Sequence, residues 1–378
     1  MSRERRKTVL IGVLGVLLVA LTAFNFIYGR GSKAALTDEP PRLDLTVSEN
    51  ARAKPVAVTL TLDGVPEHAS YGDEETEQIY DAFRPLIAEA FGAARVGGSF
   101  GKAENEVYFT FAEPQYAWLF AESLGVPPSE ALEERMFTSF SLSGEGTKLR
   151  LILYDEKGEG IPYSAPLPFA PNGMELPEAY PEPGRDSEFY GLERAAFRRD
   201  TTDLSPLLTA FGFNPNTDSR YTDASDALVV VDGARSLRIT ADGYVNYHNS
   251  EELLTAYANS DERNALRAAV RAVPHGAAFW GEGRLEVYHV ERLDDGAYSV
   301  TLSYLWRGAR LVGAESVVVV QNGGIIEARM KLMPVRLTDT LYQLLPERQA
   351  QLLAGGRRLS LNYREADGVF APEWVAER

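Results

Sequence analysis

Apolar and polar residues alternate in two stretches of the first half of the chain. Apolar side chains occupy every second position over residues 56–62 and again over 107–111, which is typical of strands with one buried face. Between these stretches, apolar residues recur at helical spacing from Ile79 to Phe91 after an acidic first turn, and Pro85 is expected to kink or divide that helix. Residues 136–154 resemble a hairpin, which completes a first group of strands around one helix.

The second half begins with three short strands joined by Asp-Gly turns, over residues 227–231, 235–240 and 244–249. A helical region follows, beginning at Ser250 and reaching Val273. The pattern then predicts two long strands, two short helices and two terminal strands, over residues 298–306, 326–332, 338–353, 359–363 and 370–375. This order of elements predicts an α+β fold with helices packed on antiparallel sheets.

Seven prolines fall between Ile161 and Gly184, too many for a helix or a central strand. We interpret this segment as a linker or a surface arm. The length of the chain predicts two domains on either side of it. These are an N-terminal α+β lobe with its proline-rich linker, residues 56–184, and a C-terminal lobe, residues 185–378.

The N-terminus predicts membrane attachment. Residues 9–28 carry no charged side chain and follow a basic cluster of three arginines and one lysine. A helix of this length spans roughly 30 Å, enough to cross a bilayer, and basic residues stay on the cytoplasmic side. We therefore expect residues 1–32 to form a cytoplasmic tail and a single transmembrane helix, and residues 33–55 to form a stalk. Everything beyond is expected to be two extracytoplasmic lobes.

A cleaved secretory signal is the alternative interpretation, but Leu21-Thr22-Ala23 fits a cleavage site poorly. Within the predicted helix, Gly12, Gly15 and Asn25 are the candidate contacts with a partner helix. The two glycines lack the four-residue spacing of the tight helix-pairing motif, and the Asn25 side chain could instead reach headgroup water.

The charge and composition of the chain exclude several classes of function. The net charge is −16, and residues 1–32 are basic, so the expected external part is more acidic still. Such a surface repels nucleic acid and anionic lipid headgroups. The absence of cysteine removes disulfides, thiolate zinc sites and cysteine nucleophiles.

A search for catalytic or metal-binding patterns finds none. Residues 97–103 resemble a phosphate-binding loop only faintly, because Ala103 stands where a magnesium-binding hydroxyl is needed. His289 and Glu291 would share a face of a strand with apolar residues, so we interpret His289 as a partly buried, hydrogen-bonded side chain. None of the histidines has a partner at the spacing of a helical metal site: His68, His248, His275 and His289. We therefore predict no catalytic residue, no metal site and no cofactor.

The second half contains sequences that resemble a known family. Residues 235–247, RSLRITADGYVNY, resemble the "sL.i...G.i.Y" hairpin of the YycH/YycI family. Residues 361–363 and 372–375 are similar to the terminal "lgY … P.W.v" hairpin of that family, and residues 303–320 to one of its strand pairs. Asn362 stands where the family often has glycine. The likeness covers residues 200–378 and the anchor, and it suggests structural roles for Tyr247, Tyr363 and Trp374.

The resemblance implies a regulatory protein and not an enzyme. Members of the family resemble external modulators that contact a membrane sensor histidine kinase and so adjust cell-wall homeostasis. The implied partners are that kinase, a sister anchored regulator and the membrane, but not nucleic acid. Two alternatives remain open at this point: an exported inhibitory module related to peptidase propeptide domains, and a cell-wall hydrolase with an unrecognised carboxylate site. For Trp374 we expect burial against the sheet of the C-terminal lobe, through the pairing of the terminal strand; an exposed residue near the chain end is the alternative.

Overall fold

The structure of the protein is a computed structural model of the 378-residue chain. It describes residues 53–70, 74–97, 103–145, 148–169, 188–216, 219–250, 261–274, 277–355, 357, 359–366 and 368–376. Residues from Thr46 onward belong to one compact unit, and the description below concerns that unit alone. The predicted transmembrane segment, residues 9–28, and the predicted stalk up to Arg52 lie outside the described residues.

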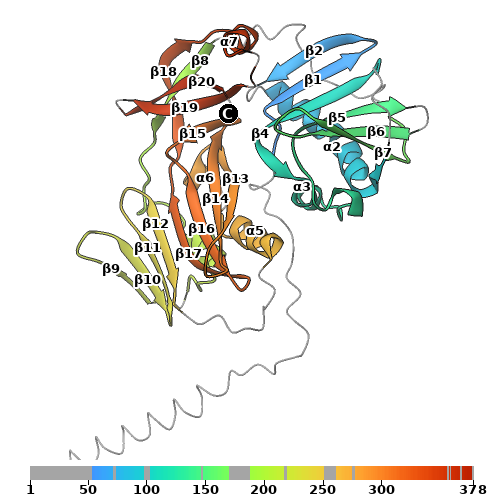
Figure 1. Cartoon of the computed structure of the whole chain (residues 1–378). Coiled ribbons are helices and arrows are strands. Elements are labelled where there is room, and N and C mark those ends of the chain that lie inside the picture. Colours follow the sequence, from blue (N-terminus) through green and yellow to red (C-terminus); the bar gives the residue numbers. More distant parts are fainter. Residues whose placement is uncertain are drawn as a thin grey trace, which may run out of the picture. The chain divides into compact units, whose positions relative to one another are not determined.

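The first half of the unit contains an antiparallel sheet, which we call the first sheet (Figure 1). Its strand order is β2-β1-β4-β5-β6-β7-β3 within the described residues. In chain order its strands are β1 (Ala57–Leu62), β2 (Val65–Ser70), β3 (Arg95–Val96), β4 (Glu106–Tyr116), β5 (Met136–Glu145), β6 (Lys148–Tyr154) and β7 (Gly160–Ala165). The helical elements of this half are α2 (Glu74–Ala93), α3 (Ala117–Ser123) and the 3-10 turn η2 (Glu130–Leu132).

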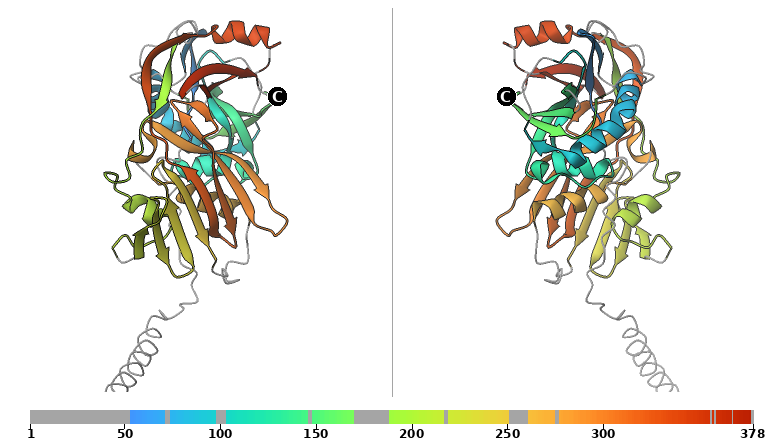
Figure 2. Two further views of the ribbon diagram at one scale, coloured as in Figure 1. Left: turned by 90° about the vertical axis from the view of Figure 1, so that its left-hand side faces the viewer. Right: turned by 90° about the vertical axis from the view of Figure 1, so that its right-hand side faces the viewer.

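Helix α2 covers one face of the first sheet (Figure 2) and runs without interruption through Pro85. The expected division at this proline is therefore wrong. Pro85 is exposed, whereas Ile79, Phe83 and Ile87 are buried on the opposite side of the helix. Their packing holds the helix together despite the hydrogen bond that proline removes. Edge-to-face and tilted aromatic pairs fill the core beneath, among them Phe91 with Phe140.

Strand β7 corrects the interpretation of residues 161–184 as entirely linker. Pro162 lies within β7, opposite Ile152 of β6. On the other side of β7, the short strand β3 pairs only with Tyr163 and Ser164. A proline is tolerated near such a sheet edge because its missing N–H deprives no neighbouring strand of a partner. Leu167 and Phe169, just after β7, also pack against the core of the first half, and residues 170–187 lie outside the described residues.

The second half forms a larger sheet, the second sheet, with the order β18-β8-β20-β19-β15-β14-β16-β17-β12-β11-β10-β9 and with β13 paired to β14. Among the described pairs, all are antiparallel except β15 with β19. The strands are β8 (Glu188–Arg194), β9 (Ser219–Thr222), β10 (Leu228–Asp232), β11 (Arg235–Ile239), β12 (Tyr244–Asn249), β13 (Gly283–Arg292), β14 (Tyr298–Trp306), β15 (Ala309–Val312), β16 (Ser316–Gln321), β17 (Gly324–Lys331), β18 (Val335–Gln343), β19 (Leu359–Ala366) and β20 (Val369–Ala376). Its helices are α4 (Ser205–Ala210), α5 (Glu262–Arg271), α6 (Ala277–Trp280) and α7 (Glu347–Leu353).

Helix α5 packs against the middle of the second sheet, on β13, β14, β16 and β17. Its N-cap is Asp261, whose carboxylate accepts a hydrogen bond from the Asn264 backbone N–H at 2.7 Å. The sequence predicted a start at Ser250, but residues 251–260 lie outside the described residues. Leu266 and Val270 place the apolar side of α5 in the core, in agreement with the expected helical spacing.

The prediction of two short helices over residues 338–353 is wrong in its first part. Residues 335–343 form strand β18, which pairs with β8, a strand that the sequence pattern did not reveal. A single helix, α7, follows it. Threonines 338 and 340 and Tyr342 favour an extended chain, and β8 supplies the pairing that a sequence pattern cannot show. Figures 1 and 2 place α7 far from β9 and β10, at the opposite end of the second sheet.

Strand β13 was also not predicted, and it contains a β-bulge. Val287 pairs with Leu302 but His289 pairs with Thr301, so Tyr288 is the extra residue. The bulge moves His289 away from the buried face, and its side chain is exposed. Our interpretation of His289 as a partly buried residue is therefore wrong.

Candidate functional site

Two of the three candidate structural residues lie in the core of the second sheet. Tyr247 is buried, stacked on Phe211 with ring centroids 4.6 Å apart. Tyr363 is buried, and its hydroxyl donates to the Tyr190 carbonyl oxygen at 3.1 Å. Trp374 is only half-buried, so the full burial that we expected does not occur. Its indole N–H nevertheless donates to the Leu345 carbonyl at 2.8 Å.

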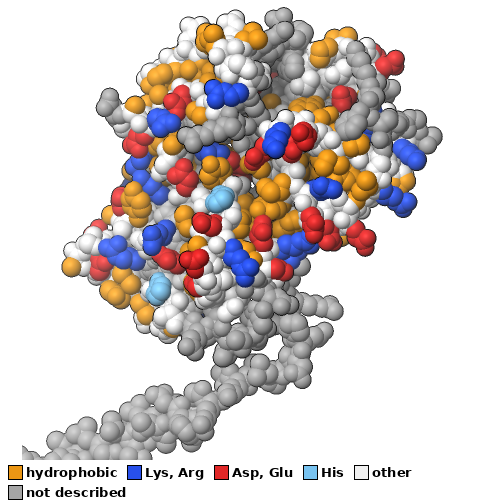
Figure 3. Space-filling model, viewed as in Figure 1, with side chains coloured by type: hydrophobic (Ala, Val, Ile, Leu, Met, Phe, Trp, Pro, Cys, Tyr) orange, Lys and Arg blue, Asp and Glu red, His pale blue; other side chains and the backbone are white. Residues whose placement is uncertain are grey.

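The candidate partner-binding residues Gly12, Gly15 and Asn25 lie outside the described residues. Across the described ranges, none of the helices combines the length and the apolar composition that crossing a bilayer requires. In the same part of the chain, no group of three or more His, Cys, Asp or Glu side chains is arranged to hold a metal ion. On the face seen in Figure 3, acidic and basic side chains are interspersed, without a large area of one sign.

The first polar cluster lies where β4 leaves the first sheet. Thr110 pairs with Ser139 of β5, but the next paired residue of β4 is Gln115, opposite Phe137. Residues 111–114 therefore bulge out of the ladder, and Pro114 cannot donate a ladder hydrogen bond there. The bulge carries the Glu113 side chain to the second sheet.

Glu113 forms a bidentate ion pair with Arg310 of β15. The Arg310 guanidinium donates from Nε to Glu113 Oε1 at 2.7 Å and from a terminal nitrogen to Oε2 at 2.5 Å. Arg310 also lies over the ring of Tyr288, the bulged residue of β13, at 4.1 Å from the centroid. We call this contact between the sheets the strand junction. Two local irregularities, one in β4 and one in β13, thus converge on one arginine.

The Glu113 carboxyl titrates near neutral pH. Its residue is 1 % exposed, and burial raises the pKa to about 7 although the charge and hydrogen bonds of Arg310 lower it. The negative charge of Glu286 raises this pKa further. Burial therefore outweighs the attraction of the arginine, and a buried pair of this kind contributes less to stability than its geometry suggests.

Glu286 of β13 is a second buried carboxylate at the strand junction. It is 2 % exposed and accepts a hydrogen bond from Arg284 Nε at 2.7 Å. Gln115 of β4 and the backbone N–H of Lys54 approach the same carboxylate at 3.4 Å each. Arg284 in turn donates to the Lys54 carbonyl at 3.1 Å. Residues of both sheets therefore satisfy this charge.

The backbone of the two sheets also meets closely near the strand junction. Gly308, in the turn between β14 and β15, has φ +83°, and a Cβ built there would lie 2.6 Å from Cγ1 of Val56. Only glycine satisfies both the positive φ and this approach. The turn therefore fits directly against the residue that precedes β1.

A second contact between the sheets, the helix junction, joins α3 to α5. Trp118 of α3 is 2 % exposed and belongs to the core of the second sheet. Arg263 and Arg267 of α5 lie over its ring at 5.4 and 5.1 Å. Arg267 also pairs with Glu122 of α3, Nε to Oε2 at 3.1 Å, and Tyr116 donates to Glu262 at 2.8 Å. These charged side chains remain partly exposed.

A cleft of about 600 Å³ opens between the two sheets beside the strand junction. The first sheet contributes the start of β1, parts of β4 and β5, and the turn between β6 and β7. The second sheet contributes Gly308, Arg310, one side of α7 and the first half of β19. Asn362, the departure from the family pattern, lines this cleft and is 7 % exposed.

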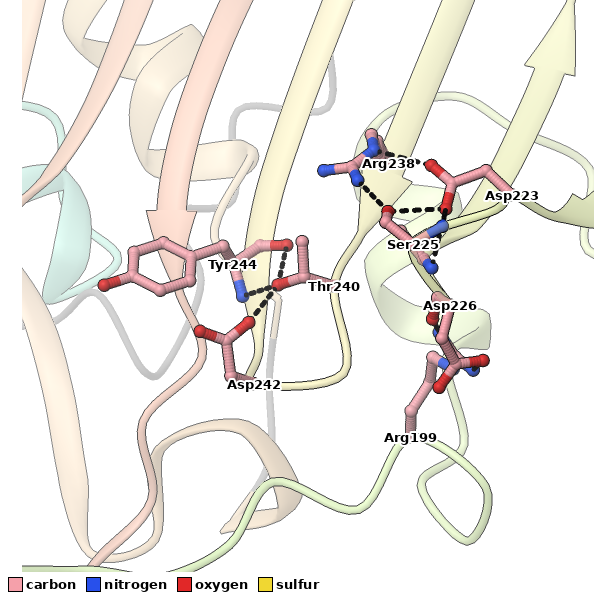
Figure 4. Close-up of polar contacts among 9 residues, drawn as sticks. Arg199, Asp223, Ser225, Asp226, Arg238, Thr240, Asp242 and Tyr244 are labelled. Carbon is pink, nitrogen blue, oxygen red and sulfur yellow. Dashed lines mark hydrogen bonds and ion pairs between the residues drawn. The ribbon is translucent and has the colours of Figure 1, made fainter.

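The turns of the β9–β12 hairpins hold their carboxylates by hydrogen bonds within the chain (Figure 4). Asp223 accepts hydrogen bonds from the backbone N–H groups of Ser225 and Ala227 at 2.8 and 3.0 Å and from Arg238 Nε at 3.0 Å. The hydrogen bond from the Ser225 hydroxyl and these further contacts hold its pKa below the usual value. The Thr240 hydroxyl bridges the next turn, donating to Asp242 at 2.5 Å. These contacts explain the acidic residues here as turn-forming groups.

One solved structure is similar to this chain over most of its length. The crystal structure of YycH from Bacillus subtilis is similar to this chain with a TM-score of 0.50, over 88 % of this chain and 97 % of that chain. The chain therefore shares the fold of YycH. The two sequences are 11 % identical, so the similarity to YycH establishes the fold and not the activity. The resemblance predicted from the sequence is confirmed at this level.

The other comparisons assign neither a family nor an activity to this chain. A dehydratase domain from the CurF module of a curacin polyketide synthase reaches a TM-score of 0.15, too low to carry an argument. Neither the known protein families nor the curated proteins contain a match to the sequence.

Sequence reasoning missed the residues of the strand junction. The alternation of Val107, Phe109 and Phe111 continues to Glu113, so extending the strand by two residues would have placed a carboxylate on the buried face. This continued alternation is the signal in the sequence that could have identified Glu113. Its partner Arg310 lies 197 residues away, and no local pattern connects the two.

Proposed function

We propose that this protein is a non-enzymatic accessory regulator of a membrane sensor histidine kinase, anchored by residues 9–28 and acting from outside the cell. The observation that carries the proposal is the YycH-like fold over nearly the whole length of both chains. The sequence motifs of the YycH/YycI family and the uncharged segment after a basic cluster support the same conclusion.

A protein of this kind acts by contact. A single membrane helix transmits no signal alone, so the protein must bind two states of a partner with different affinity. This difference in affinity can come from helix packing within the bilayer or from packing of the external domain against the partner. The proposal assigns no catalytic group and no cofactor to either route.

The test is the output of the kinase in cells. Deletion of the chain is expected to change the expression of a reporter that the kinase controls, and the wild-type chain is expected to restore it. A variant in which residues 9–28 are replaced by an unrelated apolar helix of equal length should restore it only in part. Contacts between helices in lipid contribute about 0.6 to 2 kcal/mol each, so several positions share the effect. An unchanged reporter after deletion overturns the proposal.

The single substitutions Gly12→Leu, Gly15→Leu and Asn25→Leu separate the positions within the helix. We expect partial effects on the reporter at equal protein level, with Asn25→Leu as the test of a polar contact. If the unrelated helix and all three variants restore full output, the segment is only a tether.

Topology is measured on the same strains. Because the chain has no cysteine, a single cysteine placed at Ser2 or at exposed Asn246 reports its own side of the membrane. A membrane-impermeant maleimide should label the cysteine at position 246 in intact cells and the one at position 2 only after lysis. Labelling of both in intact cells contradicts the proposed orientation.

A further inference from the structure

The cleft beside the strand junction contains an unpaired strand edge. Residues 359–362 of β19 all line it. Successive side chains of a strand point to opposite faces, so four consecutive lining residues mean that the strand presents its edge to the cleft.

The pairing of β19 shows which edge this is. On one side, β20 pairs with β19 from Leu359 to Ala366. On the other side, β15 pairs only with residues 362–364. Strand β15 begins at Ala309, after the turn at Gly308 that follows β14, and its pairing with β19 begins only at Arg310. Within the described residues, no strand pairs with residues 359–361 on this second edge.

Asn362 stands at the end of the unpaired edge. Its residue is more than nine-tenths buried and lines the cleft, and its amide makes no hydrogen bond to another described residue. Leu361 and Tyr363 on either side point into the core, so the Asn362 side chain lies on the opposite face. A carboxamide both donates and accepts, which matches a peptide group. The amide atoms of Asn362 are not among the buried polar atoms that lack a partner, so the amide is open to the cleft, where a ligand can replace water as its partner.

The charges around the cleft indicate what enters it. Lys157, Arg310 and Arg357 stand among acidic residues of the turn after β6 and of α7. A wall of mixed sign does not favour a polyanion, whereas a free strand edge recognises the main chain of an extended peptide.

We propose that the cleft binds an extended peptide segment of another protein, which adds as a strand to residues 359–361 of β19. The carboxamide of Asn362 then holds one peptide group of that segment. This site is separate from the predicted transmembrane helix and does not require the partner to be the kinase.

The test uses the full chain in detergent micelles and a phage-displayed library of random heptapeptides. Peptides enriched on the wild-type chain are synthesised, and their Kd is measured by fluorescence anisotropy. Asn362→Leu, which keeps the branched shape of the side chain but removes the amide, is expected to weaken binding about threefold to tenfold. The matched control is Asn246→Leu, at an exposed position of β12, which should leave the Kd unchanged.

A second measurement does not depend on the variant. Addition of an enriched peptide to the wild-type chain should slow the amide hydrogen exchange of residues 359–361, with little change in β9 or β10. The proposal is overturned if no peptide is enriched, if Asn362→Leu binds as tightly as wild type, or if the protection falls on other strands. None of these results affects the kinase reporter, so failure here is distinct from failure of the regulatory proposal.

Discussion

The strand junction and the helix junction both join the first sheet to the second, but they place their charges in different surroundings. The two arginines are about equally exposed, Arg310 at 23 % and Arg267 at 22 %, so the difference lies in the carboxylates. Glu113 at the strand junction is 1 % exposed, whereas Glu122 at the helix junction is 15 % exposed and keeps some contact with water. A pair with a fully buried carboxylate depends on protonation and geometry, whereas a partly hydrated pair also depends on salt.

The two junctions contribute to the structure in different ways. The helix junction takes its strength from apolar burial, because Trp118 inserts into the core of the second sheet. The strand junction contributes little net stability, since the cost of burying Glu113 offsets the attraction of Arg310. It does set a single arrangement of β4 against β15, next to the cleft. We therefore expect variants at the two junctions to change the free energy of unfolding by different amounts and with a different dependence on pH and salt.

The largest effect is expected for Trp118→Ala. Removal of this buried ring should lower the free energy of unfolding by about 3 to 5 kcal/mol, measured by urea unfolding with circular dichroism. Trp374→Ala is the matched comparison, because Trp374 is only half-buried and should lose about 1 to 2 kcal/mol. Equal losses for the two variants would contradict a dominant role for the helix junction, and no loss in Trp374→Ala would show that the terminal strand pair does not need its indole.

Arg310→Met comes next. This substitution keeps an unbranched apolar stem but leaves the Glu113 carboxylate without its partner, and the expected loss in the free energy of unfolding is about 3 kcal/mol at pH 8. The loss should be smaller at pH 5, because the isolated carboxyl then takes up a proton. The double variant E113Q/R310M removes both charges and should regain part of the stability. An equal loss at the two pH values contradicts burial of the carboxylate.

The pH dependence of Glu113 itself has a definite sign. Its pKa is raised in the folded chain to about 7 from 4.5, so the folded state binds more protons than the unfolded state between these values. Stability from this group is fully present below pH 4.5 and is lost as the pH rises to about 7. The free energy of unfolding of wild type minus that of Glu113→Gln should fall across this window by up to about 3 kcal/mol. A difference that stays flat or rises with pH would show that Arg310, and not burial, controls the carboxyl.

Much of the sheet structure followed from local signals in the sequence. The alternation over residues 298–306 predicted β14, and the Asp-Gly turns predicted the meander of β10, β11 and β12. The terminal pair, β19 and β20, was predicted from alternation as well. The burial of β14 was predicted only in part, because residues 302–306 are buried on both faces of the strand, and a local pattern does not show what covers the second face.

Other elements depend on contacts that lie far apart in the chain. Strand β18 is exposed along most of its length, so its sequence carries no period-2 pattern, and only its pairing with β8 makes it a strand. The strand junction was harder still to predict from the sequence. The buried position of Glu113 could be inferred from the alternation in β4, but the bulge at Tyr288 and the approach of Arg310 arise from tertiary packing.

The smallest predicted effect concerns salt at the helix junction. Arg267→Gln removes the ion pair with Glu122 and one of the two guanidinium groups over Trp118. Because these groups are partly hydrated, the loss in the free energy of unfolding should be about 1 kcal/mol at low ionic strength. It should shrink in 0.5 M NaCl, where the Debye length is about 4 Å, whereas the loss caused by Arg310→Met should change little. If salt weakens both effects equally, the two junctions do not differ in burial as the geometry indicates, and the comparison between them fails.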